Sequence, residues 1–145
     1  MKYDTIKGLD KKISKLIIGN DNQTEYDSAA KLWDHWIKVG GNAFDNAHIY
    51  GKGEMEKLLG EWHTKRNNRD DLVIIAKGAH TPDCNPKSLS DQLTESLDRL
   101  QIDCADIYIM HRDNIDISVD EFIDVLNKEK DKGRIKIFGG SNWTL

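Results

Sequence analysis

The stretch LVIIAK, residues 72–77, decides the fold class. It is a continuous apolar run rich in β-branched residues, and such a run is typical of a parallel strand that is covered on both faces. A second run of this kind, ADIYIMH, occupies residues 105–111. Because a helix-length amphipathic segment separates the two runs, the sequence predicts strands that lie parallel in an α/β sheet.

The same alternation of strand and helix continues on both sides of these runs. Further strands are predicted at residues 13–18 (closed by Gly19), 42–45 and 135–138. Apolar residues recur at helical spacing in four segments, residues 24–39, 55–62, 89–100 and 118–126. Ser118 and Glu121 have the spacing of a capping box at the start of the last helix. The tryptophans on these helices, Trp33, Trp36 and Trp62, fall on apolar faces and are predicted to be core residues.

Composition restricts the classes of function. A chain of 145 residues has the size of one ordinary domain and needs neither disulfides nor metals to hold it. Its net charge of −4 is spread along the chain without a Lys/Arg block, so no nucleic-acid partner is expected. No run approaches the roughly 18 apolar residues of a membrane span, and the charged start MKYDTIKGLDKK does not resemble a signal peptide. With Cys84 and Cys104 outside any metal-ligand spacing, we expect a cytoplasmic protein with reduced thiols.

Two parallel α/β architectures fit this pattern, a doubly wound sheet and a (β/α) barrel. A doubly wound dinucleotide-binding sheet would carry Gly-x-Gly-x-x-Gly directly after its first strand. The nearest match, GKGEME at residues 51–56, follows the second predicted strand and has Glu56 in place of the third glycine. The barrel is therefore the favoured architecture.

Polar side chains stand where the predicted strands end. In chain order they are Asp45, Lys77, His111 and the pair Ser141 and Asn142. Tyr50 lies five residues beyond Asp45, in the following loop. Because (β/α) barrels place their active sites at the carboxyl ends of the strands, we expect these side chains to converge.

The residue types in this set suit the reduction of a carbonyl group. A phenol of pKa about 10 is a poor acid at neutral pH, but a nearby ammonium favours the phenolate, and Lys77 is the candidate for that role beside Tyr50. Asp45 can hold Lys77 charged and oriented. His111 can donate a hydrogen bond to a substrate carbonyl or to its developing alkoxide. Since no protein side chain supplies hydride, the set implies a nicotinamide cofactor.

Three ordered segments resemble the aldo-keto reductase family. They are GNAFDNAHIYGKGEMEKLLG at residues 41–60, SLDRLQID with DIYIMH at residues 96–111, and GRIKIFGGSNW at residues 133–143. The resemblance implies a (β/α)8 TIM-barrel fold, of which residues 1–145 would be the N-terminal part, about the first five strands and four helices, as a single incomplete domain.

The resemblance also implies function. It implies an NADPH-dependent enzyme that reduces a small aldehyde or ketone to the alcohol, with Tyr50 as proton donor supported by Asp45, Lys77 and His111. It further implies that Ser141 and Asn142 hydrogen-bond the nicotinamide carboxamide. No metal site is expected from the sequence.

Two departures from the family pattern keep an alternative open. The aromatic residue that often follows the lysine is absent, since the sequence reads Gly78-Ala79-His80. The chain also stops at Leu145, after the fifth predicted strand. The alternative is therefore a truncated or non-catalytic reductase-like barrel fragment or binding subunit, and its open sheet edges would allow self-association.

Overall fold

A five-stranded parallel sheet forms the centre of the molecule in the computed structural model, which describes residues 1–143. The strands follow the order β3-β4-β5-β6-β7, so each strand pairs with its neighbour in sequence. Their bounds are Ile18–Gly19 (β3), Ala43–Asp45 (β4), Val73–Gly78 (β5), Ala105–Met110 (β6) and Ile135–Gly140 (β7). This confirms the predicted parallel α/β arrangement of five strands, which is that of a partial (β/α)8 barrel.

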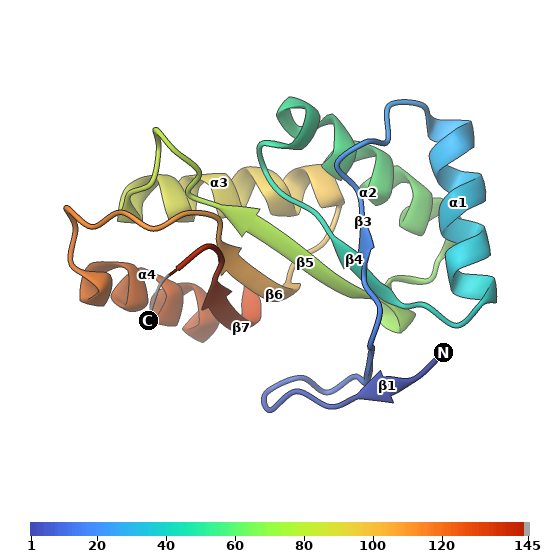
Figure 1. Cartoon of the computed structure of the whole chain (residues 1–145), viewed down its shortest axis with the longest axis horizontal. Helices are drawn as coiled ribbons and strands as arrows, with labels where there is room; N and C mark the ends of the chain where they lie inside the picture. The colour runs from blue at the N-terminus through green and yellow to red at the C-terminus, as the bar shows by residue number, and fades with distance from the viewer. Residues whose placement is uncertain (144–145) are drawn as a thin grey trace.

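Four helices alternate with these strands and follow one another around the outer face of the sheet (Figure 1). They are α1 (Tyr26–Lys38), α2 (Glu54–Arg66), α3 (Pro86–Leu100) and α4 (Val119–Asp131), with short 3₁₀ turns η1 (Tyr50–Gly53) and η2 (Arg69–Asp71). No helix within residues 1–143 combines the length and the apolar character that crossing a bilayer requires.

The strand predicted over residues 13–18 is wrong as a single element. Ile13–Ser14 forms β2, which pairs antiparallel with β1 (Tyr3–Asp4), and only β3 joins the main sheet. The Ser14 amide donates to Asn42 Oδ1 at 2.8 Å, and the Ser14 hydroxyl donates to the Leu16 carbonyl at 2.7 Å. These bonds bend the chain between the two strands and leave Leu16 64% exposed.

Helix starts are set by side-chain caps. Helix α3 begins three residues before the predicted Leu89, because Asn85 Oδ1 accepts from the Ser88 amide at 2.9 Å and Pro86 occupies the first turn. Ser118 caps α4 as predicted, but its hydroxyl accepts from the Asp120 amide at 3.4 Å instead of the Glu121 amide expected for a capping box.

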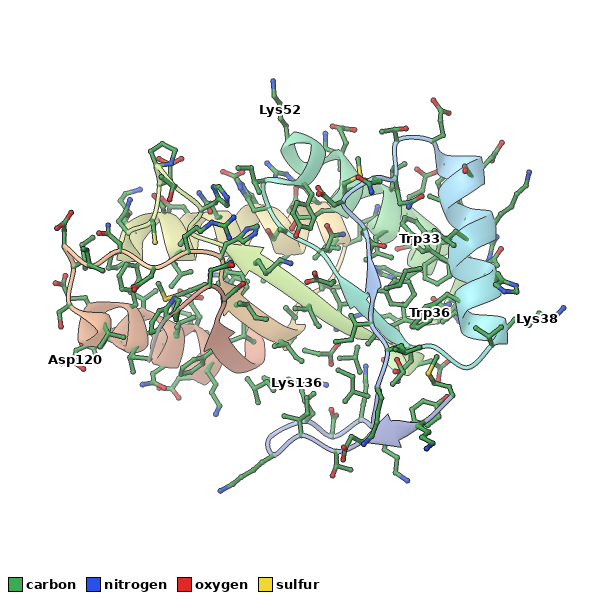
Figure 2. The ribbon with its side chains drawn as sticks, viewed as in Figure 1. Trp33, Trp36, Lys38, Lys52, Asp120 and Lys136 are labelled. Atoms are coloured by element: carbon green, nitrogen blue, oxygen red, sulfur yellow. The ribbon has the colours of Figure 1, made fainter. Side chains whose placement is uncertain are left out.

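The larger core lies between the sheet and the helices. Trp62 is fully buried there, with its ring 5.5 Å from the rings of both Trp33 and Phe44. Trp36 packs against this cluster from α1 and is half-buried (Figure 2). The inner face carries a smaller cluster that includes Ala43, Val73, Ile75 and Ile107. Every residue of β5 is buried, which confirms that the run at 72–77 is covered on both faces.

A buried carboxylate fastens the β1–β2 hairpin to the amino end of the sheet. Asp106 is fully buried, and Oδ2 accepts from the Ile74 amide and from Arg69 Nη1, both at 2.9 Å. Lys136 Nζ lies 2.9 Å from Oδ1, and Lys11 Nζ, from the hairpin loop, lies 3.6 Å from it. Because a buried charge must be paired, this cluster fixes the hairpin at one end of the sheet and leaves the carboxyl end free for a site. Figure 2 shows Lys136 near the hairpin and Lys52, from η1, at the opposite end.

Candidate active site

The parallel register brings the predicted site residues to one end of the sheet. Asp45 is the last residue of β4, as predicted. Lys77 is the penultimate residue of β5, because the strand continues one residue past the predicted end, to Gly78. His111 follows β6 directly, and Ser141 follows β7 directly. The His111 amide donates to the Gly78 carbonyl at 2.7 Å, which ties the ends of β5 and β6 together.

An ion pair between Lys77 and Asp45 forms the centre of this site. Lys77 Nζ donates to both carboxylate oxygens of Asp45, at 2.6 and 2.7 Å. The Lys77 side chain is only 8% exposed, whereas that of Asp45 is 35% exposed. An ammonium in such a position requires a counter-charge, and Asp45 supplies it.

Tyr50 lies against this ion pair and against His111. Lys77 Nζ is 4.9 Å from the centroid of the Tyr50 ring, a distance at which a cation and an aromatic face attract each other. The His111 ring meets the same tyrosine edge-on, with centroids 5.8 Å apart and planes at 83°. The structure therefore brings Asp45, Lys77, Tyr50 and His111 together.

Arg99 on α3 hydrogen-bonds to the loop that carries Tyr50. Arg99 Nη1 donates to the His48 carbonyl at 3.4 Å and to the buried Glu56 at 3.3 Å, and Nη2 donates to Glu95 at 2.7 Å. Gly53 permits this approach, because a Cβ there would lie 2.6 Å from the guanidinium. Arg99 belongs to the SLDRL motif, but its contact with the loop depends on tertiary structure that the motif does not reveal.

Burial controls the protonation of His111. Its side chain is buried, and this burial, followed by the charge on Lys77, lowers the pKa of His111 to about 4. The ring nitrogen Nδ1 is buried and has no hydrogen-bond partner among residues 1–143. His111 is therefore neutral at physiological pH and can act as a hydrogen-bond donor without carrying a charge.

This pKa gives a pH-dependent prediction. Because the folded pKa is about 4, we expect the His111 ring in the full-length protein to stay neutral from pH 9 down to about pH 5. NMR titration of the imidazole nitrogens checks this, with the resonance assigned by its loss in His111→Gln.

The comparison with an unfolded chain gives the sign of the linkage. An unfolded histidine titrates near its ordinary pKa of about 6.5, so between about pH 6.5 and 4 the unfolded state binds more protons than the folded state. The contribution of His111 to stability is therefore lost as the pH falls through that window. A His111 resonance that titrates near neutral pH in the folded protein would contradict the assignment.

The turn after β5 places His80 beside His111. Ala79 has a left-handed backbone conformation, with φ 56°. Its amide donates to Gln92 Oε1 at 2.8 Å. The His80 ring then meets the His111 ring edge-on, with centroids 4.8 Å apart. His80 was not expected to be a site residue, and the sequence signal that could have found it is its position three residues after Lys77.

Two cavities meet at Lys77. One, of about 320 Å³, lies between the Tyr50 loop and the turn after β5, and its lining includes Lys77, His80 and His111. The other, of about 370 Å³, lies over the inner face of the sheet, and its lining includes Asp45, Lys77 and Ser141. A molecule in either cavity would contact the Lys77 side chain, so the site is open from two sides.

Ser141 and Asn142 adjoin this site. The Ser141 amide donates to the Met110 carbonyl at 2.9 Å, and Asn142 Nδ2 donates to Ser141 Oγ at 2.8 Å and to the His111 carbonyl at 3.3 Å. These bonds occupy the amide nitrogen of Asn142 and leave Asn142 Oδ1 as an acceptor and the Ser141 hydroxyl as a donor.

The fold defines the class of the chain as a (β/α)-barrel protein, and its candidate site lies at the carboxyl edge of the sheet. A sequence model described as "Aldo/keto reductase family" matches residues 15–145. The chain therefore belongs to the aldo-keto reductase family.

Relatives and solved structures agree with this assignment. Norsolorinic acid reductase B of Aspergillus parasiticus is 32% identical over 127 residues, which cover 79% of this chain and 33% of that protein. The uncharacterized oxidoreductase YrpG of Bacillus subtilis is 25% identical over 162 aligned positions, covering 99% of this chain and 50% of that protein.

The holo form of the aldo-keto reductase AKR11C1 from Bacillus halodurans superposes with a TM-score of 0.86 at 27% identity, covering 97% of this chain and 50% of that one. The chain thus spans from a third to about half the length of these relatives.

Proposed function

We propose that the protein containing this chain reduces an aldehyde or ketone to the alcohol with NADPH, and that Tyr50 donates the proton. Membership of an oxidoreductase family supports a reductase. The observation that carries the proposal is the position of the Lys77 ammonium, paired with Asp45 and 4.9 Å from the Tyr50 ring, with a neutral histidine beside the same ring.

Each side chain has a role in this proposal. The Tyr50 hydroxyl gives its proton to the carbonyl oxygen as that oxygen becomes an alkoxide. The phenolate left behind is stabilised by the charge on Lys77, which Asp45 keeps in place. Neutral His111 donates a hydrogen bond to the same oxygen, which polarises the carbonyl without adding a charge to the site.

The residues after β7 fit the nicotinamide that this reaction requires. When bound, NADPH supplies the hydride that no side chain can provide. A carboxamide has one acceptor and one donor group, and the Ser141 hydroxyl and Asn142 Oδ1 are the matching donor and acceptor. Ser141 also lines the same cavity as Asp45 and Lys77, so these two residues would hold the carboxamide beside the proton donor.

The proposal extends to the whole molecule. We infer that residues 1–145 form the N-terminal part of a single (β/α)8 barrel domain, since the sheet matches about half of the AKR11C1 chain. The partner is a small-molecule carbonyl compound. The two free thiols, Cys84 and Cys104, support a cytoplasmic location, where thiols stay reduced.

A steady-state assay of the full-length protein tests the function. NADPH absorbance is followed with a panel of aldehydes and ketones, and NADH serves as the matched cofactor. The proposal expects aldehyde-dependent oxidation of NADPH that is faster than oxidation of NADH. If no carbonyl compound accelerates cofactor oxidation, the alternative of a non-catalytic barrel fragment or binding subunit is favoured.

A protein made of residues 1–145 alone gives a separate prediction. Closing a (β/α)8 barrel takes eight strands and about 250 residues, so in this protein β3 and β7 would both be edge strands. We expect it to self-associate through these edges and to bind NADPH poorly. Light scattering and cofactor fluorescence measure the two properties, with the full-length protein as control. A monomer that binds NADPH as tightly as the full-length protein would show this expectation to be wrong.

A further inference from the structure

His80 lies in the cleft beside the proposed proton-transfer groups and takes no part in the proposed proton transfer. It lines the 320 Å³ cavity together with Lys77 and His111. Two contacts hold it in position. Its ring meets the His111 ring edge-on, with centroids 4.8 Å apart. The amide of the preceding residue, Ala79, donates a hydrogen bond to Gln92 Oε1 at 2.8 Å. The ring is thus held in contact with His111, in the same cavity.

The hydrogen bonding of His80 determines which of its ring nitrogens is available as an acceptor. Its Nδ1 lies 2.8 Å from the Thr81 carbonyl oxygen. Because a carbonyl oxygen only accepts, Nδ1 must carry the proton, and in the neutral ring Nε2 is then an acceptor. Nε2 makes no hydrogen bond within residues 1–143 and is not among the buried atoms without a partner, so it is accessible.

The rest of the cleft has a mixed lining. It includes the polar residues Thr81, Asp83 and Gln92 beside the apolar Ile49 and Pro82. The aromatic residue that often follows the lysine in the family is absent from this segment, which reads Gly78-Ala79-His80. An acceptor nitrogen in such a cleft selects for a substrate that presents a donor.

We propose that His80 is a specificity-determining residue that accepts a hydrogen bond from a hydroxyl on the carbon next to the substrate carbonyl. The substrate class is then the α-hydroxy aldehydes and ketones. The two imidazoles are in contact, so His111 binds the carbonyl oxygen while His80 binds the oxygen on the neighbouring carbon. This inference rests on the proposed carbonyl reduction and deepens it.

The test compares two aldehydes of the same shape in the full-length protein. Lactaldehyde carries a hydroxyl where 2-methylpropanal carries a methyl group. We expect kcat/KM to favour lactaldehyde by at least about tenfold, and His80→Phe, which keeps a ring beside His111 but removes the acceptor, to lower that ratio by about tenfold or more. An unchanged ratio in His80→Phe would overturn the proposal.

Controls separate this proposal from simpler explanations. His35→Phe changes an exposed histidine of α1 and should leave the ratio as it is. 2-Methoxypropanal keeps the oxygen but lacks the hydrogen-bond donor, so its kcat/KM with the unmodified protein should be close to that of 2-methylpropanal. This comparison does not depend on whether a variant folds. If the protein reduces lactaldehyde and both analogues equally well, this inference fails while the reductase function stands. If it reduces none of the three but reduces other carbonyl compounds of the panel, only the inference fails. If no carbonyl compound is reduced, the function and the inference fail together.

Discussion

Replacing Tyr50 by phenylalanine in the full-length protein is expected to lower kcat/KM for carbonyl reduction by about 10²–10⁴-fold, the usual loss when a general acid is removed. The substitution deletes only the hydroxyl. It keeps the ring that lies 4.9 Å from Lys77 Nζ and 5.8 Å from the His111 ring, so packing of the site should persist. Cofactor affinity, measured by fluorescence titration, should change little.

Tyr26 provides a matched control within the same chain. Its ring also lies under an ammonium, that of Lys65, at 4.3 Å, but between α1 and α2, against the main core. Its hydroxyl is buried without a hydrogen-bond partner among the described residues. Tyr26→Phe should therefore leave the activity unchanged. Full activity in Tyr50→Phe would remove Tyr50 from the mechanism.

Lys77→Met is expected to give the second large effect. Methionine approximates the aliphatic stem but removes the charge that stabilises the Tyr50 phenolate, so kcat should fall by about 10²–10³-fold, as when a charge-stabilising group is lost from other enzymes. Urea unfolding should show lower stability as well, because Asp45 loses its partner. That loss should be smaller than the ~3–5 kcal/mol typical of a broken buried pair, because the Asp45 side chain is 35% exposed and partly hydrated.

The matched control for this change is Lys65→Met. Lys65 also pairs with a carboxylate, Glu61, and lies over a tyrosine ring, but its side chain is 53% exposed. Exposed pairs contribute little to stability, so this variant should behave like the unmodified protein. If Lys77→Met retains the kcat of the unmodified protein, the charge on Lys77 does not stabilise the Tyr50 phenolate during the reaction.

The parts of the fold that the sequence predicted correctly depend on local pattern. The runs at residues 72–77 and 105–111 predicted β5 and β6, and the polar residues at the ends of apolar strands predicted that Asp45 and His111 would lie at the same end of the sheet. The parallel order of the strands then brings together residues that are far apart in the chain.

The parts that the sequence did not reveal depend on contacts between distant residues. The break in the first strand follows from the bond between Ser14 and Asn42, which no window of sequence contains. The role of Arg99 in holding the Tyr50 loop and the position of His80 beside His111 likewise arise only when α3 packs under both loops. The early start of α3 was different, since Asn85 followed by Pro86 is a local signal that periodicity alone overlooks.

Isotope transfer tests the central claim most directly, because it follows the hydride to the carbon that the proposed site acts on. The full-length protein is incubated with lactaldehyde and 2-methylpropanal and with NADPH that carries deuterium at both C4 positions, and the alcohols are analysed by mass spectrometry. The account predicts one deuterium on the former carbonyl carbon of each alcohol, and almost no product from Tyr50→Phe. Unlabelled alcohol, or no alcohol from either aldehyde, would contradict it.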